Sequence, residues 1–353
     1  ICGNSYSADC GVVTVVDCAL TSSDDEIVMS TGDTVTITSG GSIIVDDHDN
    51  GGLIQLPGSS SNLTIENRGT LQVGKYINDD GDVVGTQTGE RSTIRTTNNS
   101  TNPTLTNYGT IAAISNTVNF TEAQGNITID NKSGAIISAK GDNDYGTINL
   151  KNAGDVTQGT ISITNAGTIQ ALGAPYNNVA NTFSHHTLRL SNITNGGTVT
   201  IDNSGIIEAG ASNAINLNGT TDPITLTNSG TIKVETIGAI SGRYTTNLTI
   251  VNSGTITGAG TTNKSPDDAD EGSIVLHNLN ASGGSGATIT NSGTIEASGL
   301  DYHAISIGTD DTGSAGYNNV TITNSGTIAG DQTTGDGVAG HAIRVFGDSS
   351  GTT

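Results

Sequence analysis

The chain has 353 residues, of which 49 are glycine and only 3% are aromatic, and it contains no tryptophan. Its 34 acidic residues outnumber 12 basic ones, and the resulting formal net charge of −22 disfavours binding to nucleic acid or anionic lipid. Apolar residues still make up 33% of the chain in short alternating runs, which argues against general disorder, and no stretch has the 3.6-residue periodicity of a long helix.

The first 33 residues differ from the rest of the chain. Cys2, Cys10 and Cys18 all lie there, and no cysteine follows them. Their spacing fits neither a zinc site nor a Cys-x-x-Cys redox motif, so we predict one disulfide of open pairing, an oxidising setting, and one thiol that is free or joined to another chain. The apolar run at 12–16 predicts a short strand. We interpret residues 1–33 as a cap over the edge of a β-stack.

From residue 34 onward one phrase recurs. In its clearest copy, at 320–328, the alternating Val-Thr-Ile-Thr predicts a strand, Asn-Ser-Gly predicts a turn, and Thr-Ile begins a second strand. Asparagine and glycine both tolerate positive φ in such a turn, and glycine also avoids a Cβ clash. The spacing varies from 24 residues (228 to 252) to 40 residues (67 to 107), which is typical of a solenoid, a propeller or an array. The nine copies have their asparagines at Asn67, Asn107, Asn131, Asn165, Asn203, Asn228, Asn252, Asn291 and Asn324.

A second phrase lies between most copies and predicts a third strand in each repeat. Examples are Gly-Thr-Ile-Asn-Leu at 146–150 and His-Ala-Ile-Ser-Ile at 303–307, where two apolar residues at i and i+2 face inward. A propeller blade would need four antiparallel strands at nearly constant length. Three strands and variable loops instead predict an all-β fold, a parallel β-helix (β-solenoid) of about ten coils of three short strands over 34–353.

We expect the nine asparagines to stack at one corner of the β-helix. Each side-chain amide can donate to one neighbour and accept from the other, which forms a ladder parallel to the axis. We interpret this role as structural. Outward Thr-x-Thr pairs suggest a regular array of the kind that binds ice, but Glu66, Asp130, Asp202 and Val251 interrupt it. We therefore favour β-propensity on a polar outer face.

Residue types with reactive side chains do not gather in the sequence as a reaction centre would require. No two adjacent coils both place an acid at the outward position of the first strand, as paired carboxylate chemistry would need. His185 and His186 are adjacent, and His303 and His341 occupy similar places in their coils. We interpret these histidines as corner residues and not as metal ligands or bases. The sequence thus predicts a protein that is not an enzyme.

Acidic loops leave one alternative open. Asp79, Asp80 and Asp82 form a cluster that looks like half a calcium loop, but the distal glutamate is missing. Solvated acidic loops are the simpler interpretation, so we predict no cofactor and keep calcium as the weaker alternative. No apolar run approaches 18 residues, so we predict no transmembrane helix in this chain.

The Thr-Ile-x-Asn-Ser-Gly-Thr-Ile copies and the His/Gly-x-Ile-x-Leu strands between them resemble the passenger domains of bacterial autotransporters, the type V secretion family. The resemblance covers about 34–353. It implies a right-handed β-helix that is secreted to the outer surface of a Gram-negative cell and projects outward as a rod. It also implies roles in adhesion, aggregation or biofilm formation.

Three functions follow from these observations, in decreasing order of preference. The first is a non-catalytic extracellular scaffold or adhesin, displayed on the cell surface, whose partners are surface molecules of a host or neighbouring cell or other copies of itself. The second is a structural subunit that stacks end to end into a filament or surface layer, since an uncapped β-helix end is an unpaired edge. The third is a polysaccharide-degrading β-helix enzyme.

Overall fold

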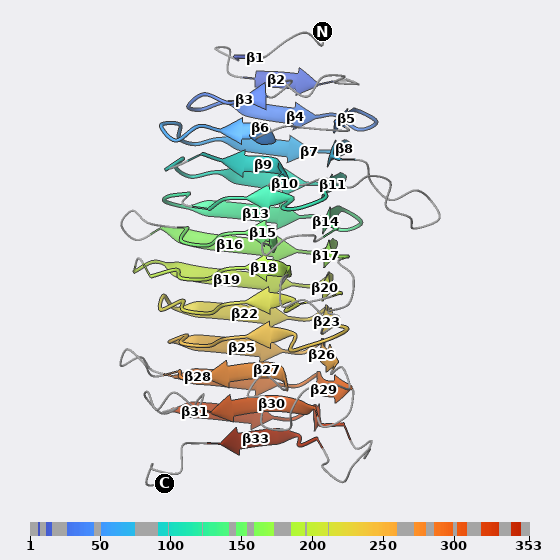
Figure 1. The fold of residues 1–353 in the computed structure, drawn as a ribbon, viewed down its shortest axis with the longest axis vertical. Helices are drawn as coiled ribbons and strands as arrows, with labels where there is room; N and C mark the ends of the chain where they lie inside the picture. The colour runs from blue at the N-terminus through green and yellow to red at the C-terminus, as the bar shows by residue number, and fades with distance from the viewer. Residues whose placement is uncertain are drawn as a thin grey trace, which may run out of the picture.

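The chain winds into a parallel β-helix, as predicted (Figure 1). The computed structural model describes residues 6–7, 12–15, 27–45, 51–74, 91–97, 99–121, 123–140, 146–153, 159–172, 185–194, 196–210, 212–259, 272–279, 286–298, 302–308, 319–331 and 340–346. All regular structure within these ranges is β-strand, and three parallel sheets run along the stack.

The sheets, which we call A, B and C, contain 12, 11 and 10 strands, in agreement with the prediction of about ten coils. Sheet A contains β1 (Tyr6–Ser7), β3 (Ile27–Val28), β6 (Gly51–Leu56), β9 (Arg91–Thr96), β12 (Val118–Asn119), β15 (Gly146–Asn149), β18 (His186–Arg189), β21 (Ile215–Asn216), β24 (Ile240–Ser241), β27 (Gly272–His277), β30 (His303–Gly308) and β33 (Ile343–Phe346). Sheet B contains β2 (Val12–Val15), β4 (Thr34–Ile37), β7 (Thr64–Asn67), β10 (Thr104–Asn107), β13 (Ile127–Asn131), β16 (Thr160–Asn165), β19 (Thr198–Asn203), β22 (Ile224–Asn228), β25 (Leu248–Asn252), β28 (Ala287–Asn291) and β31 (Val320–Asn324). Sheet C contains β5 (Ser42–Val45), β8 (Thr70–Val73), β11 (Thr110–Ala113), β14 (Ile136–Ala139), β17 (Thr168–Ala171), β20 (Ile206–Ala209), β23 (Thr231–Val234), β26 (Thr255–Ala259), β29 (Thr294–Ser298) and β32 (Thr327–Ala329).

From β4 onward each coil takes one strand from each sheet in the order B, C, A, as β16, β17 and β18 do. The repeated phrase supplies the B strand, the corner and the C strand, and the second phrase supplies the A strand. Register is kept by the phrase and not by the spacing: Asn107 pairs with Asn131, and Asn131 pairs with Asn165, although the intervals are 24 and 34 residues. The extra residues lie after the C strand or the A strand.

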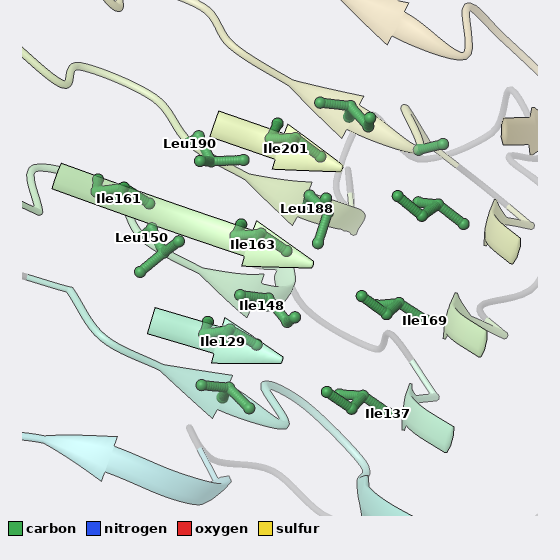
Figure 2. Packing of buried hydrophobic residues seen from close by; sticks show 14 of the residues in the cluster. Ile129, Ile137, Ile148, Leu150, Ile161, Ile163, Ile169, Leu188, Leu190 and Ile201 are labelled. Carbon is green, nitrogen blue, oxygen red and sulfur yellow. The ribbon is translucent and has the colours of Figure 1, made fainter. Parts of the chain in front are cut away.

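The core consists of apolar rows that run along the axis. Ile129, Ile163 and Ile201 follow one another on sheet B, and all three are fully buried (Figure 2). Ile137 and Ile169 do the same on sheet C. The alternation in the sequence produces this core, because successive side chains of a strand point to opposite faces of the sheet. A single coil cannot enclose such rows, so its stability depends on its neighbours.

Strands from residues 1–33 also belong to the stack. The short strand predicted at 12–16 is confirmed as β2, and it pairs in parallel with β4, while β1 pairs with β3. These strands extend sheets A and B at the amino-terminal end. That residues 1–33 act as a cap stays a prediction, and Cys2, Cys10 and Cys18 lie outside the described residues.

Candidate functional site

The repeated asparagines stack at the corner between sheets B and C. Each Nδ2 group donates to the Oδ1 atom of the next asparagine over 2.7–2.9 Å, in the order Asn67, Asn107, Asn131, Asn165, Asn203, Asn228, Asn252, Asn291 and Asn324. The members from Asn67 to Asn291 are at most 2% exposed. Nδ2 also donates to a backbone carbonyl of the next coil, as from Asn165 to Ile206 at 3.0 Å. These amides therefore hold the corner together, and few of their hydrogen-bonding groups remain available to a ligand.

The glycine that follows each ladder asparagine avoids a Cβ clash, as expected, but its φ is not positive. Positive φ was expected, but Gly109, Gly205 and Gly254 lie outside the left-handed region, so that expectation is wrong. A Cβ atom on Gly254 would lie 2.1 Å from the carbonyl oxygen of Gly230 in the preceding coil. The clash recurs at 2.0–2.2 Å from Gly69 to Gly326. Glycine is needed because the backbones of neighbouring coils touch there.

One copy of the corner departs from this rule. The sequence Asn-Lys-Ser-Gly-Ala at 131–135 is two residues longer, and Ala135 takes the place of the glycine whose carbonyl the next coil approaches. Gly134 does have positive φ, at 77°, which lets the longer turn return to register. Asn131 keeps its place in the ladder.

The outer face of sheet B carries a continuous row of hydroxyl groups. Its members are all at least partly exposed, and they pair from coil to coil without interruption: Thr34, Thr64, Thr104, Thr128, Ser162, Thr200, Thr225, Thr249, Thr288 and Thr321. The interruptions noted in the sequence, Glu66, Asp130, Asp202 and Val251, fall in the second outward row. We call the first row the hydroxyl row. The two rows can be told apart only from the register in which the strands of sheet B pair.

Two of the acids in the second outward row are paired with cations. Arg68 contacts Glu66 at 2.5 Å, and Lys132 contacts Asp130. The hydrogen bond with Glu66 raises the pKa of Arg68. The guanidinium group of Arg68 also lies 4.2 Å from the centroid of the Tyr108 ring. This end of sheet B therefore presents paired charges beside the hydroxyl row.

His186, one of the predicted corner histidines, is buried and contacts two polar side chains. Its Nδ1 atom lies 2.9 Å from Ser212 Oγ, and its Nε2 atom lies 2.7 Å from Asn216 Nδ2. Asn216 Oδ1 accepts from the backbone N–H of Asn218, which fixes the amide orientation, so Nε2 accepts and Nδ1–H donates to the serine. Burial, aided by the nearby charge of Arg189, lowers the pKa of His186 to about 3. A ring that donates to the serine cannot deprotonate it, so the contact is structural.

A second histidine group lies at the last described coil of sheet A. The rings of His303 and His341 stack with centroids 5.2 Å apart and planes within 6°. The backbone N–H of His341 donates to His303 Nδ1 over 2.9 Å. Arg344 Nη1 lies 3.2 Å from His303 Nε2, and its guanidinium carbon lies 4.9 Å from the Phe346 ring centroid. This group, unlike the ladder, brings cationic and aromatic side chains together.

The calcium candidates cannot be placed on this framework. Asp79, Asp80 and Asp82 lie outside the described residues. Among the side chains that the structure does describe, no three from His, Cys, Asp and Glu lie close enough together to hold a metal ion. The described ranges also include no helix that is long and apolar enough to cross a membrane.

A further set of corner contacts was missed by the sequence reasoning. Four threonines in or directly before A strands donate through Oγ1 to a backbone carbonyl of the next coil's C strand: Thr93, Thr117, Thr147 and Thr187. The sequence feature that could have predicted these contacts is the polar residue before isoleucine or leucine in the second phrase, as in Gly-Thr-Ile-Asn-Leu. These contacts join sheets C and A as the asparagines join B and C.

Comparison with known proteins finds no match to a family model, to a curated protein or to a solved structure. The fold and the contacts described above are therefore the basis for any functional proposal.

Proposed function

We propose that the chain is a non-catalytic extracellular scaffold whose outer faces serve adhesion. The observation that supports this most is the hydroxyl row, which follows sheet B through ten coils from Thr34 to Thr321. Neighbouring strands lie about 4.8 Å apart, so the row repeats its hydroxyl groups at that interval along the stack. The asparagine ladder and the glycine contacts keep the coils in register, so the row is preorganised.

A partner with its own repeat can use such a row. A surface polysaccharide of a host or neighbouring cell offers hydroxyl groups at regular intervals, and many weak contacts made together give useful avidity. The resemblance of the repeated phrase to autotransporter passengers supports display at a cell surface.

Removal of hydroxyl groups from this face tests the proposal. The triple variant Thr225→Val, Thr249→Val and Thr288→Val keeps β-branched side chains on sheet B while removing three neighbouring hydroxyl groups. The matched control makes the same change on sheet C, at Thr231, Thr255 and Thr294. We expect binding to immobilised cell-surface polysaccharides to weaken in the sheet B variant only.

Two results would count against adhesion through this face. One is equal binding by the two triple variants, and the other is failure of the wild-type protein to bind any polysaccharide or cell tested. The polysaccharide recovered from the assay should also keep its chain length, whereas shortening would favour the polysaccharide-degrading enzyme.

End-to-end assembly is the second candidate, and exposed apolar side chains on β33, the last described strand of sheet A, favour it. Ile343 and Val345 of β33 are 41% and 55% exposed, although they continue the apolar rows of sheet A. At the other end, β2 and β4 place Val15 and Ile37, and not asparagine, in the ladder position, so a head-to-tail contact would not continue the ladder. Electron microscopy of the purified protein tests end-to-end assembly. Filaments that are lost in the Val345→Glu variant would support it, and a wild-type protein that stays monomeric would rule it out.

A further inference from the structure

Two hydrogen-bond donors from the last described coil meet a single imidazole ring of the coil before it. His303 begins β30 and is 3% exposed. Its Nδ1 atom receives the backbone N–H of His341, and its Nε2 atom faces Nη1 of Arg344 at 3.2 Å. The backbone N–H group and the guanidinium N–H groups can only donate hydrogen bonds.

The ring can satisfy only one of these donors. Burial, together with the positive charges of Arg344 and His341, lowers the pKa of His303 to about 4, so the ring is neutral at pH 7. A neutral imidazole has one acceptor nitrogen and one N–H group. Because Nδ1 accepts from His341, Nε2 carries the hydrogen and points at a second donor. Turning the ring over would place a carbon against the His341 N–H, so it does not remove the conflict.

We propose that Arg344 and His303 form a binding site for a carboxylate, whose oxygen atoms accept hydrogen bonds from Nη1 of Arg344 and from Nε2–H of His303. An acceptor shared by the two groups turns an unfavourable donor–donor contact into two charge-assisted hydrogen bonds. A planar carboxylate matches the fork of the guanidinium group better than a spherical anion does.

The surroundings hold both groups in place and leave the site open. The His341 ring stacks on His303, and the Phe346 ring lies beside the guanidinium group. His303 itself is nearly buried, but Arg344 is partly exposed, so a ligand approaches Nε2 of His303 from the side of the guanidinium group. Among its described contacts Arg344 meets an imidazole and a phenyl ring but no carboxylate, although the chain carries 34 acidic residues.

This site goes beyond the proposed adhesive role and does not depend on it. The hydroxyl row belongs to sheet B, whereas β30 and β33 belong to sheet A. The carboxylate can come from a free small acid or from a uronic acid in a polysaccharide, and the experiment separates these sources.

Titration of the full chain with glucuronate, followed by NMR signals of the histidine rings, tests the site. Glucose at the same concentration and ionic strength is the uncharged control. We expect a saturable shift of the His303 signal, which is identified by its loss in His303→Asn. Arg344→Gln should weaken the binding at least about tenfold, since a charge-assisted contact is lost.

Arg95→Gln is the matched control variant and should bind as the wild type does. Arg95 occupies the same outward row of sheet A, but Ser92 stands three residues before it, where His341 stands before Arg344. A wild-type protein without a saturable shift overturns the proposal, and so does equal binding by Arg344→Gln. Where the site binds, a polyglucuronate oligomer that binds more tightly than the monomer identifies a polysaccharide source, and equal affinity identifies a small acid.

Discussion

Two copies of one eight-residue sequence lie in different surroundings at the carboxy-terminal end of the stack. Thr-Ile-Thr-Asn-Ser-Gly-Thr-Ile occurs at 288–295 and again at 321–328. Ile289 is fully buried and Asn291 is 1% exposed, whereas Ile322 is only partly buried and Asn324 is exposed. The first copy pairs with β25 and β31, but the second pairs with β28 alone among the described strands. The neighbouring coils, and not the local sequence, determine how much each copy buries.

Truncation of the equivalent isoleucines gives the largest expected difference between the two copies. Ile289→Ala removes a fully buried side chain between two coils and should lower the free energy of unfolding by about 3–4 kcal/mol. Ile322→Ala should lower it by about 1 kcal/mol, because its side chain already meets solvent. Urea unfolding followed by circular dichroism measures both values. Equal losses would mean that another segment covers the last coil.

Replacement of the two ladder asparagines should give a smaller difference. Asn291 accepts from Asn252 at 2.7 Å and donates to Asn324 at 2.8 Å, so Asn291→Leu leaves buried polar groups without partners and should cost about 2–3 kcal/mol. Asn324→Leu removes the last acceptor of the ladder at an exposed position and should cost about 1 kcal/mol or less. Hydrogen exchange should show the first variant opening the coils on both sides of β28. If hydrogen-exchange protection of the coils beside β28 is the same in Asn291→Leu as in the wild type, the ladder has no stabilising role.

The fold and the ladder could be predicted because the sequence of each repeat contains the residues that determine them. Alternation gives the strands, the recurring asparagine gives the corner, and like residues stack whatever the loop length. The other features depend on which residues become neighbours across coils. The need for glycine at 254 comes from the carbonyl oxygen of Gly230, the hydroxyl row emerges only when the rows are separated by register, and Asn216 meets His186 from 30 residues away. A single repeat contains no sign of these contacts.

The last effect that we predict is a pH dependence set by burial inside the stack. The folded-state pKa of His186 is about 3, well below the 6.5 of an exposed histidine, because burial disfavours the charged ring. Below pH 6.5 the unfolded chain binds a proton that the folded chain does not, so stability is complete above pH 6.5 and falls as the pH drops. At pH 5.5 this contribution is about 1 kcal/mol lower than at pH 7.5. In His186→Gln the dependence should be weaker by that amount in urea unfolding at the two pH values. Identical pH dependence in the two proteins would mean that the ring is protonated, and so reached by solvent, within the folded stack.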